Sequence, residues 1–210
     1  MFITFEGIEG SGKTTQINHI LNYLTAKGYD CLGTREPGDT VIGKKIRAIL
    51  LNPDHNELVP QAELFLYAAD RAQHISERIL PALAKGKIVV CDRFFDATTA
   101  YQGYARGLDL SLIDQINTIV LGTLKPDLTV LFDLLPEEGL KRAWKQIDGG
   151  SRAGDETRFE FEKRSFHEKV RKGYLKLAEN EPDRIRVIDA SKSEAEVKQQ
   201  ILDIISLKIN

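Results

Sequence analysis

One glycine-rich segment near the start of the chain constrains the fold more than any other feature. Residues 7–14 read Gly-Ile-Glu-Gly-Ser-Gly-Lys-Thr and match the pattern G-x-x-x-x-G-K-[ST]. The apolar run Phe2–Phe5 precedes the segment, and Thr14–Lys27 follows it with apolar residues at helical spacing. A strand, a glycine-rich loop and a helix in this order indicate a binding site for a nucleoside triphosphate.

The residue types of this loop suit the binding of phosphate groups. Glycines let the backbone curl so that its N–H groups point at phosphate oxygens, and the following helix N-terminus adds a partial positive charge. Lys13 is expected to bridge the terminal phosphates, and the Thr14 hydroxyl is expected to bind Mg²⁺. We therefore predict Mg²⁺ as the cofactor that accompanies the nucleotide.

Short β-branched runs alternate with longer segments of helical periodicity along the chain. This alternation predicts an α/β fold, with a five-stranded parallel sheet flanked by helices on both faces. Because there is no repeat or Pro/Gly-rich linker, we expect a single domain over residues 1–210 with a mobile lid at about residues 148–158. Strands are predicted at Phe2–Phe5, Tyr29–Gly33, Ile88–Asp92, Leu128–Asp133 and Ile185–Asp189. Helices are predicted at Thr14–Lys27, Gly43–Leu51, Gln61–Lys85 with a break near Pro81, Ser111–Leu121, Pro136–Ile147, Phe159–Glu179 and Ser193–Lys208.

Composition and charge narrow the classes of partner. The chain has 29 basic and 31 acidic residues, and its net charge of −2 does not favour binding to nucleic acid. No apolar run approaches the roughly 18 residues of a membrane span, and the first residues lack the pattern of a signal peptide. We therefore expect a cytoplasmic protein with no nucleic-acid or membrane partner.

Charged residues at the ends of predicted strands are candidates for ligand binding, because parallel sheets bind ligands at the carboxyl ends of their strands. They are Glu6, Asp92, Asp133 and Asp189. Asp92 is placed to hold the metal, directly or through water. The adjacent Arg93 suits a second phosphate group, because a guanidinium binds phosphate with two donors. A plain ion pair between Asp92 and Arg93 is the alternative.

A second polar segment has the composition of a flap that closes over phosphates. Residues 148–158 read Asp-Gly-Gly-Ser-Arg-Ala-Gly-Asp-Glu-Thr-Arg, between two predicted helices. Arg152 and Arg158 are both candidates for the arginine that contacts the transferring phosphoryl group. A solvated loop is the alternative that this composition leaves open.

Several motifs together resemble the thymidylate kinase family, within the nucleoside monophosphate kinases, and the resemblance covers essentially the whole chain. The phosphate loop alone indicates only a nucleotide-binding protein, whereas Arg-Glu-Pro-Gly and Ala-Tyr-Gln-Gly in this order are far more specific. The residues that carry the resemblance are Phe5–Thr15, Thr34–Gly38, Tyr67–His74, Asp92–Phe94, Ala100–Gly103 and Lys125–Thr129.

The resemblance implies transfer of the ATP γ-phosphoryl group to dTMP, giving dTDP and ADP for dTTP synthesis, by an enzyme that is a homodimer. The implied catalytic residues are Lys13, Arg93, Arg158 and Arg152, with Arg158 the better match to the flap arginine. The implied ATP-binding residues are Gly7, Gly10, Ser11, Gly12, Lys13, Thr14 and Thr15. The implied metal-binding residues are Thr14, Asp92 and Glu9.

The resemblance also assigns the dTMP site. Arg93 matches the arginine that holds the 5′-phosphate, Tyr67 the ring that stacks on thymine, and Arg71 the donor to the base carbonyl. Thr98 matches a contact to the edge of the thymine ring. Residues that match the walls around the sugar, the base and the nucleotide are Glu9, Glu36, Pro37, Arg47, Tyr101 and Gln102.

The chain departs from the family pattern at three positions. Asp39 stands where a second glycine is common, Ala97 where serine is usual, and Phe94 where tyrosine is more frequent. Two alternatives to a dTMP kinase stay open: a kinase for another pyrimidine monophosphate such as dUMP, and a nucleotide-dependent switch or binding module. The chain lacks the N-K-x-D motif of a GTPase switch.

Overall fold

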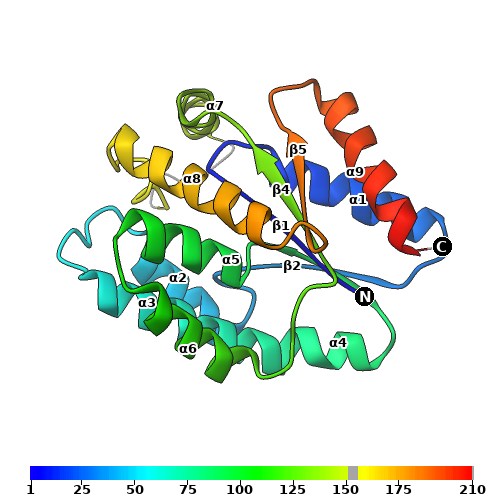
Figure 1. The fold of residues 1–210 in the computed structure, drawn as a ribbon, viewed down its shortest axis with the longest axis horizontal. Helices are drawn as coiled ribbons and strands as arrows, with labels where there is room; N and C mark the ends of the chain where they lie inside the picture. The colour runs from blue at the N-terminus through cyan, green and yellow to red at the C-terminus, as the bar shows by residue number, and fades with distance from the viewer. Residues whose placement is uncertain (151–155, 210) are drawn as a thin grey trace.

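The computed structural model describes residues 1–150 and 156–209 and has one parallel sheet of five strands, in the order β2-β3-β1-β4-β5. Figure 1 shows the sheet between two layers of helices, which confirms the predicted α/β fold class. Within the described residues, each helix is too short or too polar to cross a bilayer. The strands are β1 Phe2–Gly7, β2 Cys31–Arg35, β3 Ile88–Asp92, β4 Leu128–Asp133 and β5 Ile185–Asp189.

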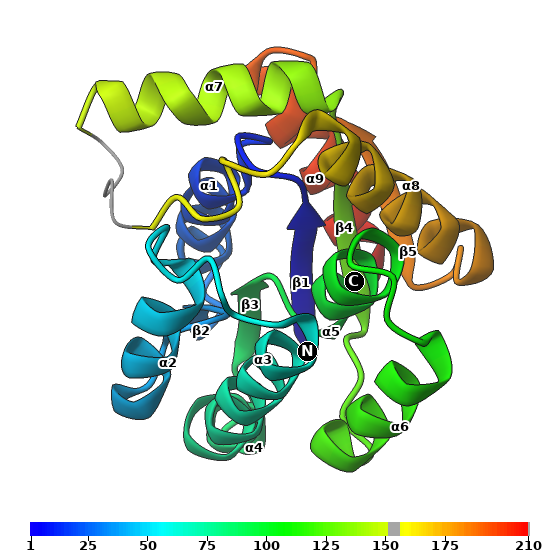
Figure 2. The ribbon, with the colours of Figure 1, turned by 90° about the vertical axis from the view of Figure 1, so that its left-hand side faces the viewer.

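Helices α1 and α9 pack against each other on one face of the sheet, and most of the remaining helices lie on the other face (Figures 1 and 2). The pair on the first face is α1 Lys13–Ala26 and α9 Glu194–Ile209. The other helices are α2 Val41–Leu51, α3 Pro60–His74, α4 Leu80–Ala84, α5 Phe95–Thr98, α6 Leu110–Leu121, α7 Pro136–Asp148 and α8 Arg164–Asn180. Two π-helical segments, η1 Ile75–Ile79 and η2 Thr99–Ala105, continue α3 and α5.

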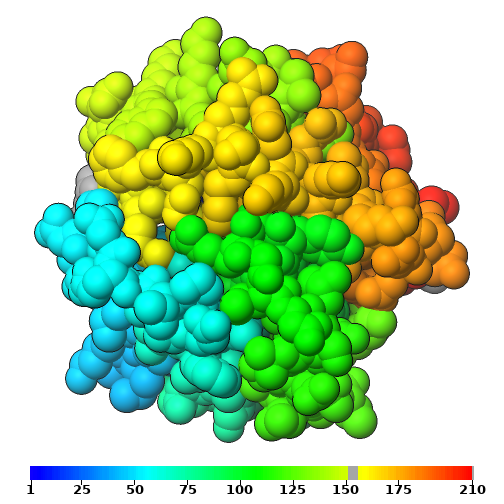
Figure 3. All heavy atoms as spheres, turned by 60° about the vertical axis from the view of Figure 1, so that its left-hand side comes forward, coloured from blue at the N-terminus to red at the C-terminus, as the bar shows by residue number. Residues whose placement is uncertain are grey.

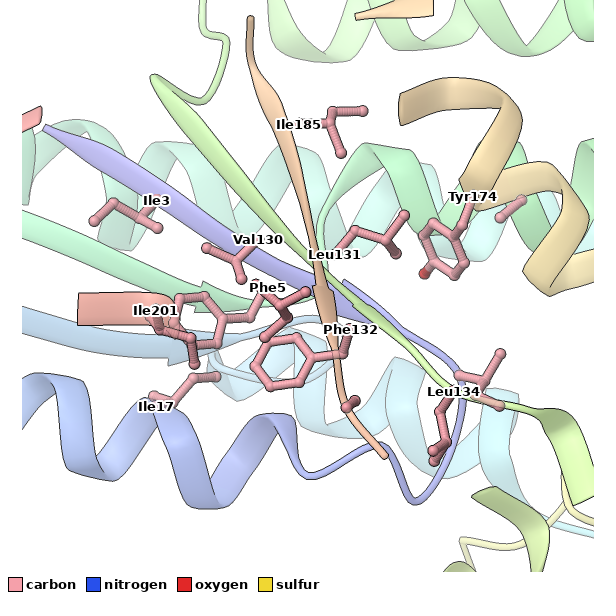
Figure 4. Packing of buried hydrophobic residues seen from close by; sticks show 14 of the residues in the cluster. Ile3, Phe5, Ile17, Val130, Leu131, Phe132, Leu134, Tyr174, Ile185 and Ile201 are labelled. Carbon is pink, nitrogen blue, oxygen red and sulfur yellow. The ribbon is translucent and has the colours of Figure 1, made fainter. Parts of the chain in front are cut away.

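The central strands β1 and β4 are buried on both faces, as expected for a parallel sheet covered by helices. The rings of Phe5 and Phe132 pack with their centroids 5.4 Å apart. Figure 4 shows Ile17 of α1 and Ile201 of α9 on the side of these rings, with Tyr174 of α8 across the strands. This packing holds β1, and with it the loop that follows β1, against the centre of the sheet.

The strand register brings the candidate residues to one edge of the sheet. Phe5 of β1 pairs with Asp92 at the end of β3, and Arg35 at the end of β2 pairs with the same Asp92. On the other side, Gly7 pairs with Phe132 of β4. The loops after β1, β2 and β3 therefore leave the sheet side by side.

Most predicted elements agree with the structure to within two residues at each end, and three differences stand out. β2 spans Cys31–Arg35 rather than Tyr29–Gly33. The predicted break near Pro81 is the π-helical segment η1, where the Leu80 N–H donates to the Ile75 carbonyl. Proline has no N–H to donate to the carbonyl four residues earlier, which favours such a local change of pattern.

The third difference is the helix predicted at Phe159–Glu179, which begins only at Arg164. The Phe159 ring is instead buried edge-on against Tyr101, with the centroids 5.4 Å apart. Helix α5 and η2 were not predicted. Because the residues of η2 are buried almost all round, their sequence has no polar face and hence no amphipathic period.

Candidate active site

A cavity of about 460 Å³ opens at the carboxyl ends of β1, β2 and β3. Its lining comes mainly from the loop after β1, the segment around the end of β2, helix α3 and the segment from Asp92 to Gln102. Helices α1 and α2, the end of α7 and the segment before α8 contribute the remaining residues. Six of the seven predicted ATP-binding residues line the cavity, and Gly7 lies just behind them. All ten predicted dTMP-binding residues also line it, namely Glu9, Glu36, Pro37, Arg47, Tyr67, Arg71, Arg93, Thr98, Tyr101 and Gln102.

The loop after β1 requires glycine at specific positions. Gly10 has a φ of +69°, and a Cβ there would lie 2.0 Å from the carbonyl oxygen of Gly139 in α7. Gly12 has a φ of +91° and directly precedes helix α1. The loop therefore turns tightly and directs the N-terminus of α1 at the cavity, an arrangement that favours bound anions.

Lys13 is buried at the floor of this loop. Its Nζ donates to the carbonyl oxygens of Gly7 at 3.0 Å and Ile8 at 2.9 Å, and to Ser11 Oγ at 3.2 Å. Burial and the nearby positive charge of Arg93 lower the pKa of Lys13 to about 8. A phosphate group in the loop would stabilise the charged ammonium by opposing both effects.

Thr14 and Asp92 lie together at the cavity. The Thr14 hydroxyl donates to Asp92 Oδ2 at 2.9 Å, although the two residues are far apart in the sequence. A hydroxyl and a carboxylate are oxygen ligands of the kind that Mg²⁺ prefers, so these two residues fit a magnesium site. Glu9, the third predicted metal residue, uses Oε1 to accept hydrogen bonds from Arg93 at 2.9 Å and Tyr101 at 2.6 Å.

Arg93 follows β3 in an unusual backbone conformation. Its φ is +68°, a value that non-glycine residues adopt only where the surroundings enforce it, often at functional sites. Its guanidinium donates to Tyr174 Oη at 3.1 Å and to Glu9 at 2.9 Å, and it lies 4.9 Å from the centre of the Tyr101 ring. These contacts hold a cationic group in the wall of the cavity.

The buried carboxyl group of Glu6 supports this conformation from behind. Glu6 Oε1 accepts a hydrogen bond from the Phe94 N–H at 2.7 Å, and Oε2 accepts one from Tyr174 Oη at 2.7 Å. Burial raises the pKa of Glu6 to about 8, and the negative charge of Asp96 adds to this rise. Glu6 thus links β1, the turn at Arg93 and helix α8.

This raised pKa predicts a pH-dependent contribution to stability. Because the folded state binds the Glu6 proton up to about pH 8 and the unfolded state releases it near pH 4.5, folding loses stability as the pH rises between these values. Glu6→Gln mimics the neutral form and should remove this loss. We expect urea unfolding from pH 5 to pH 8 to show the variant gaining stability relative to the native chain. Parallel pH curves for the two proteins would contradict the assignment.

Arg71 is the central donor on the α3 side of the cavity, and only 2% of its side chain is exposed. Its Nε donates to Glu36 at 2.8 Å, and its NH2 donates to the Phe94 carbonyl and to Thr98 Oγ1 at 3.1 and 3.0 Å. Glu36 also contacts His74 Nδ1 at 2.9 Å. Glu36 therefore orients Arg71 and also lines the cavity, where the resemblance placed it.

Two predicted wall residues are tied to the segment that precedes α8. Arg47 donates to the Pro37 carbonyl at 2.9 Å and binds both carboxylate oxygens of Glu156 at 2.6–2.7 Å. The loop after β2 and residue 156 are thus joined through one guanidinium.

The three departures from the family pattern have different surroundings. Asp39 accepts hydrogen bonds from Thr34 Oγ1 at 2.7 Å and from Arg78 at 3.0 Å, so its carboxylate is held at the side of the cavity. Phe94 is fully buried, with its ring 5.0 Å from that of Phe2 and beneath the Arg71 guanidinium. Ala97 lines the cavity.

The structure describes only one of the two candidate flap arginines. Arg152 lies outside the described residues. Arg158 is 8% exposed and does not line the cavity; its NH2 donates to Glu63 and its Nε to the Leu50 carbonyl, each at 2.5 Å. Figure 3 shows the yellow residues near 158 resting against the cyan residues near 50, consistent with the hydrogen bond from the Arg158 N–H to the Leu51 carbonyl. In this structure Arg158 is therefore an internal ion-pair partner.

Sequence reasoning missed Glu63 and His167. Glu63 lies four residues before Tyr67 and eight before Arg71 on α3, and this i, i+4, i+8 spacing was a usable signal. His167 of α8 is buried with its Nδ1 3.3 Å from Glu9 Oε2. No local pattern indicates that His167 meets a residue of the phosphate loop, because the contact depends on the packing of α8.

Comparison with known proteins identifies the family. The family model described as thymidylate kinase matches residues 5–201. A thymidylate kinase from Desulfosudis oleivorans is 56% identical over 202 residues, covering 96% of this chain and 94% of the relative. One from Desulforapulum autotrophicum is 57% identical over 209 residues, covering 100% of this chain and 92% of the relative. The crystal structure of thymidylate kinase from Ehrlichia chaffeensis matches with a TM-score of 0.76 and 35% identity over 98% of both chains. This chain therefore belongs to the thymidylate kinase family, whose members are P-loop nucleoside monophosphate kinases.

Proposed function

We propose that this enzyme transfers the γ-phosphoryl group of ATP to the 5′-phosphate of dTMP, giving ADP and dTDP. The observation that carries the proposal is a single cavity lined by Lys13 and the phosphate loop on one side and by Arg93, Tyr67 and Arg71 on the other. One side suits a triphosphate, and the other suits a phosphate joined to a base. Membership of the thymidylate kinase family supports the same reading.

On the donor side, the loop N–H groups, the N-terminus of α1 and Lys13 bind the phosphates of ATP. Thr14 and Asp92 would hold Mg²⁺, which when bound neutralises part of the charge on the phosphate oxygens. Glu9 acts chiefly by orienting Arg93 and Tyr101, the two groups that bond to its Oε1.

On the acceptor side, Arg93 binds the 5′-phosphate and Tyr67 stacks on the base. Arg71 offers NH1 to the base carbonyl; its Nε and NH2 are already bonded, and no hydrogen bond joins NH1 to the residues described. The Thr98 oxygen accepts from Arg71, which leaves its hydroxyl hydrogen to donate at the ring edge. Tyr101 and Gln102 complete the wall beside the sugar and base.

The reaction needs alignment and charge stabilisation rather than a covalent intermediate. An oxygen of the dTMP phosphate attacks the γ-phosphorus while the bond to the β-phosphate oxygen breaks, and ADP leaves with that electron pair. Two polyanions repel one another in solution. Lys13 and Arg93 reduce this repulsion and hold the reacting groups in line, which are the main sources of catalysis in such transfers. We also propose that the lid expected at about residues 148–158, of which 151–155 lie outside the described residues, closes over the substrates, excludes water and limits hydrolysis of ATP.

The test is ADP release with ATP and Mg²⁺ and one of six acceptors: dTMP, dUMP, dCMP, dGMP, UMP or AMP. We expect a high rate with dTMP and a lower one with dUMP. Higher activity with another monophosphate would agree with the roles given to the phosphate-binding residues. It would contradict the base-site roles of Tyr67, Arg71 and Thr98. Slow ADP release at a rate that does not depend on which acceptor is added would support a nucleotide-dependent switch instead.

For the lid we propose that Arg152, rather than Arg158, contacts the transferring phosphoryl group, because the Arg158 guanidinium is bonded to Glu63 and Leu50. We expect Arg152→Ala to lower kcat at least tenfold further than Arg158→Ala. Arg158→Ala should lower the free energy of unfolding by about 1–3 kcal/mol, because Glu63 loses one buried donor. Steady-state kinetics and urea unfolding of the two variants measure both effects. A larger loss of kcat in Arg158→Ala would reverse the assignment.

We also propose a single-domain chain that assembles as a homodimer in the cytoplasm. Helices α2, α3 and α6 are neighbours in one layer, and each exposes large apolar side chains, including Ile42 and Ile49, Phe65, and Ile119. Phe65 is 58% exposed and Ile119 is 82% exposed, values that a second copy of this layer would reduce. Light scattering that gives the mass of one chain at micromolar concentration would contradict the dimer.

A further inference from the structure

A buried carboxylate outside the predicted site residues joins the base side of the cavity to the segment before α8. The side chain of Glu63 is fully buried. Its Oε1 accepts a hydrogen bond from Gln102 Nε2 at 2.7 Å, and its Oε2 accepts one from Arg158 at 2.5 Å. Arg106 donates to both oxygens, at 3.3 and 3.2 Å. Four donor contacts from three side chains thus fix the position of this carboxylate.

The carboxylate determines which way the Gln102 amide faces. An ionised carboxylate can only accept hydrogen bonds, so Gln102 must turn its NH2 group toward Glu63. The amide oxygen, on the opposite side of the same planar group, is then directed away from Glu63. This oxygen accepts no hydrogen bond from the residues described and is not among the buried oxygens without a partner, while Gln102 lines the cavity. It is therefore open to an occupant of the cavity.

The cavity wall consequently presents both an acceptor and a donor, and Arg71 bonds to Thr98, which lies four residues before Gln102. Gln102 supplies the acceptor oxygen, and Arg71 supplies the donor, with NH1 left for an occupant. Thymine and uracil carry an imide N–H next to a carbonyl oxygen, which matches this pair. Cytosine carries an unprotonated ring nitrogen next to an amino group, which opposes it at both positions. The pattern depends on the amide of Gln102 not turning over.

We propose that Glu63 is a positioning residue for base selectivity: by fixing the Gln102 amide, it makes the site accept imide bases and reject cytosine. Glu63 does not line the cavity and acts through Gln102. The inference rests on the proposed function and extends it to the origin of pyrimidine discrimination.

The test compares kcat/KM for dTMP with kcat/KM for dCMP in Glu63→Gln. A glutamine at this position can present either its oxygen or its NH2, so the Gln102 amide is free to turn either face to the cavity. We expect the dTMP/dCMP ratio to fall about tenfold or more, the effect of one buried hydrogen bond exchanged for an opposed one. A merely structural role would lower both rates and leave the ratio intact.

The matched control is Glu162→Gln. Glu162 pairs with Arg106 at 2.5 Å, so this variant removes the same charge beside the same arginine. Its contact with Arg106 is separate from the contact between Glu63 and Gln102, and we expect the ratio to stay near the native value.

A second variant covers the case in which Glu63→Gln does not fold. Gln102→Met keeps the length of the side chain and removes the amide, so we expect the ratio to fall here too. In the Gln102→Met background, Glu63→Gln should change the ratio no further, because the two act in series. The proposal is overturned if Gln102→Met or Glu63→Gln keeps the native ratio, or if Glu63→Gln lowers it equally in both backgrounds. A native chain inactive with dTMP would instead show the proposed function itself to be wrong.

Discussion

Replacing Lys13 with methionine should lower kcat for ADP formation in the presence of dTMP by about 10²–10³-fold, the usual loss when one preorganised donor to a transition-state oxyanion is removed. Methionine keeps the aliphatic length of lysine and removes the ammonium group that bonds to Gly7, Ile8 and Ser11. Burial lowers the pKa of Lys13 to about 8, because an ammonium group is costly to bury. The side chain still carries its charge at pH values below about 8.

The control for this variant is Lys44→Met, which removes an exposed lysine from α2. We expect kcat and the melting temperature of the control to stay near the native values. The melting temperature of Lys13→Met should also change little, because a buried charge is lost together with its hydrogen bonds. If Lys13→Met turns over at close to the native rate, phosphoryl transfer does not depend on this loop and the mechanism is wrong.

Replacing Arg93 with alanine should lower kcat/KM for dTMP by about 10²–10³-fold while changing KM for ATP much less. The guanidinium lies in the cavity wall, where Tyr174, Glu9 and the Tyr101 ring hold it. Removing one preorganised cationic donor to a reacting anion costs about 10²–10³ in rate. Breaking the buried pair with Glu9 also lowers the folding stability, by about 3–5 kcal/mol, because Glu9 is left without its arginine.

Two further variants separate binding from structure. Arg93→Lys keeps the charge and loses the paired donors, so we expect an intermediate kcat/KM for dTMP. Arg186→Ala removes an exposed arginine from β5 and should leave the kinetics unchanged. Steady-state kinetics at varied dTMP and at varied ATP distinguish the two sides of the cavity. An equal rise in KM for both substrates would argue against an acceptor-phosphate role for Arg93.

Elements with a clear local pattern were predictable. β3, β4 and β5 match their predicted bounds, and α1 differs from its prediction by one residue at each end. Their apolar runs or 3.6-residue periods are stronger than the competing signals. Prediction failed at η2 and at Phe159, where nearly every side chain is buried by contacts distant in the sequence. In such segments neither side of the helix is exposed to solvent, so the sequence shows no periodic alternation of polar and apolar residues.

The candidate site also has features that local motifs predict and contacts that depend on the packing of distant segments. The phosphate loop is a contiguous motif. Of the four residues that the strand-end rule named, Asp92 lines the cavity and Glu6 lies behind it, whereas Asp133 pairs with Arg171 and Asp189 bonds to Ser191. No rule of spacing indicates that Glu6 bonds to Tyr174, or that Glu9 faces His167. For Arg158, composition and resemblance suggested a phosphate contact, whereas the folded chain pairs it with Glu63, 95 positions away.

Local backbone preferences and short motifs were enough to predict the fold class, the family and the phosphate loop from the residues alone. The way the cavity residues are held became visible only in the folded chain: the left-handed backbone of Arg93, the orientation of Arg71 by Glu36, and the fixed amide of Gln102. The physical reason is that a buried charge or amide must find its partner within hydrogen-bond distance, and packing of distant segments alone determines which partner is there.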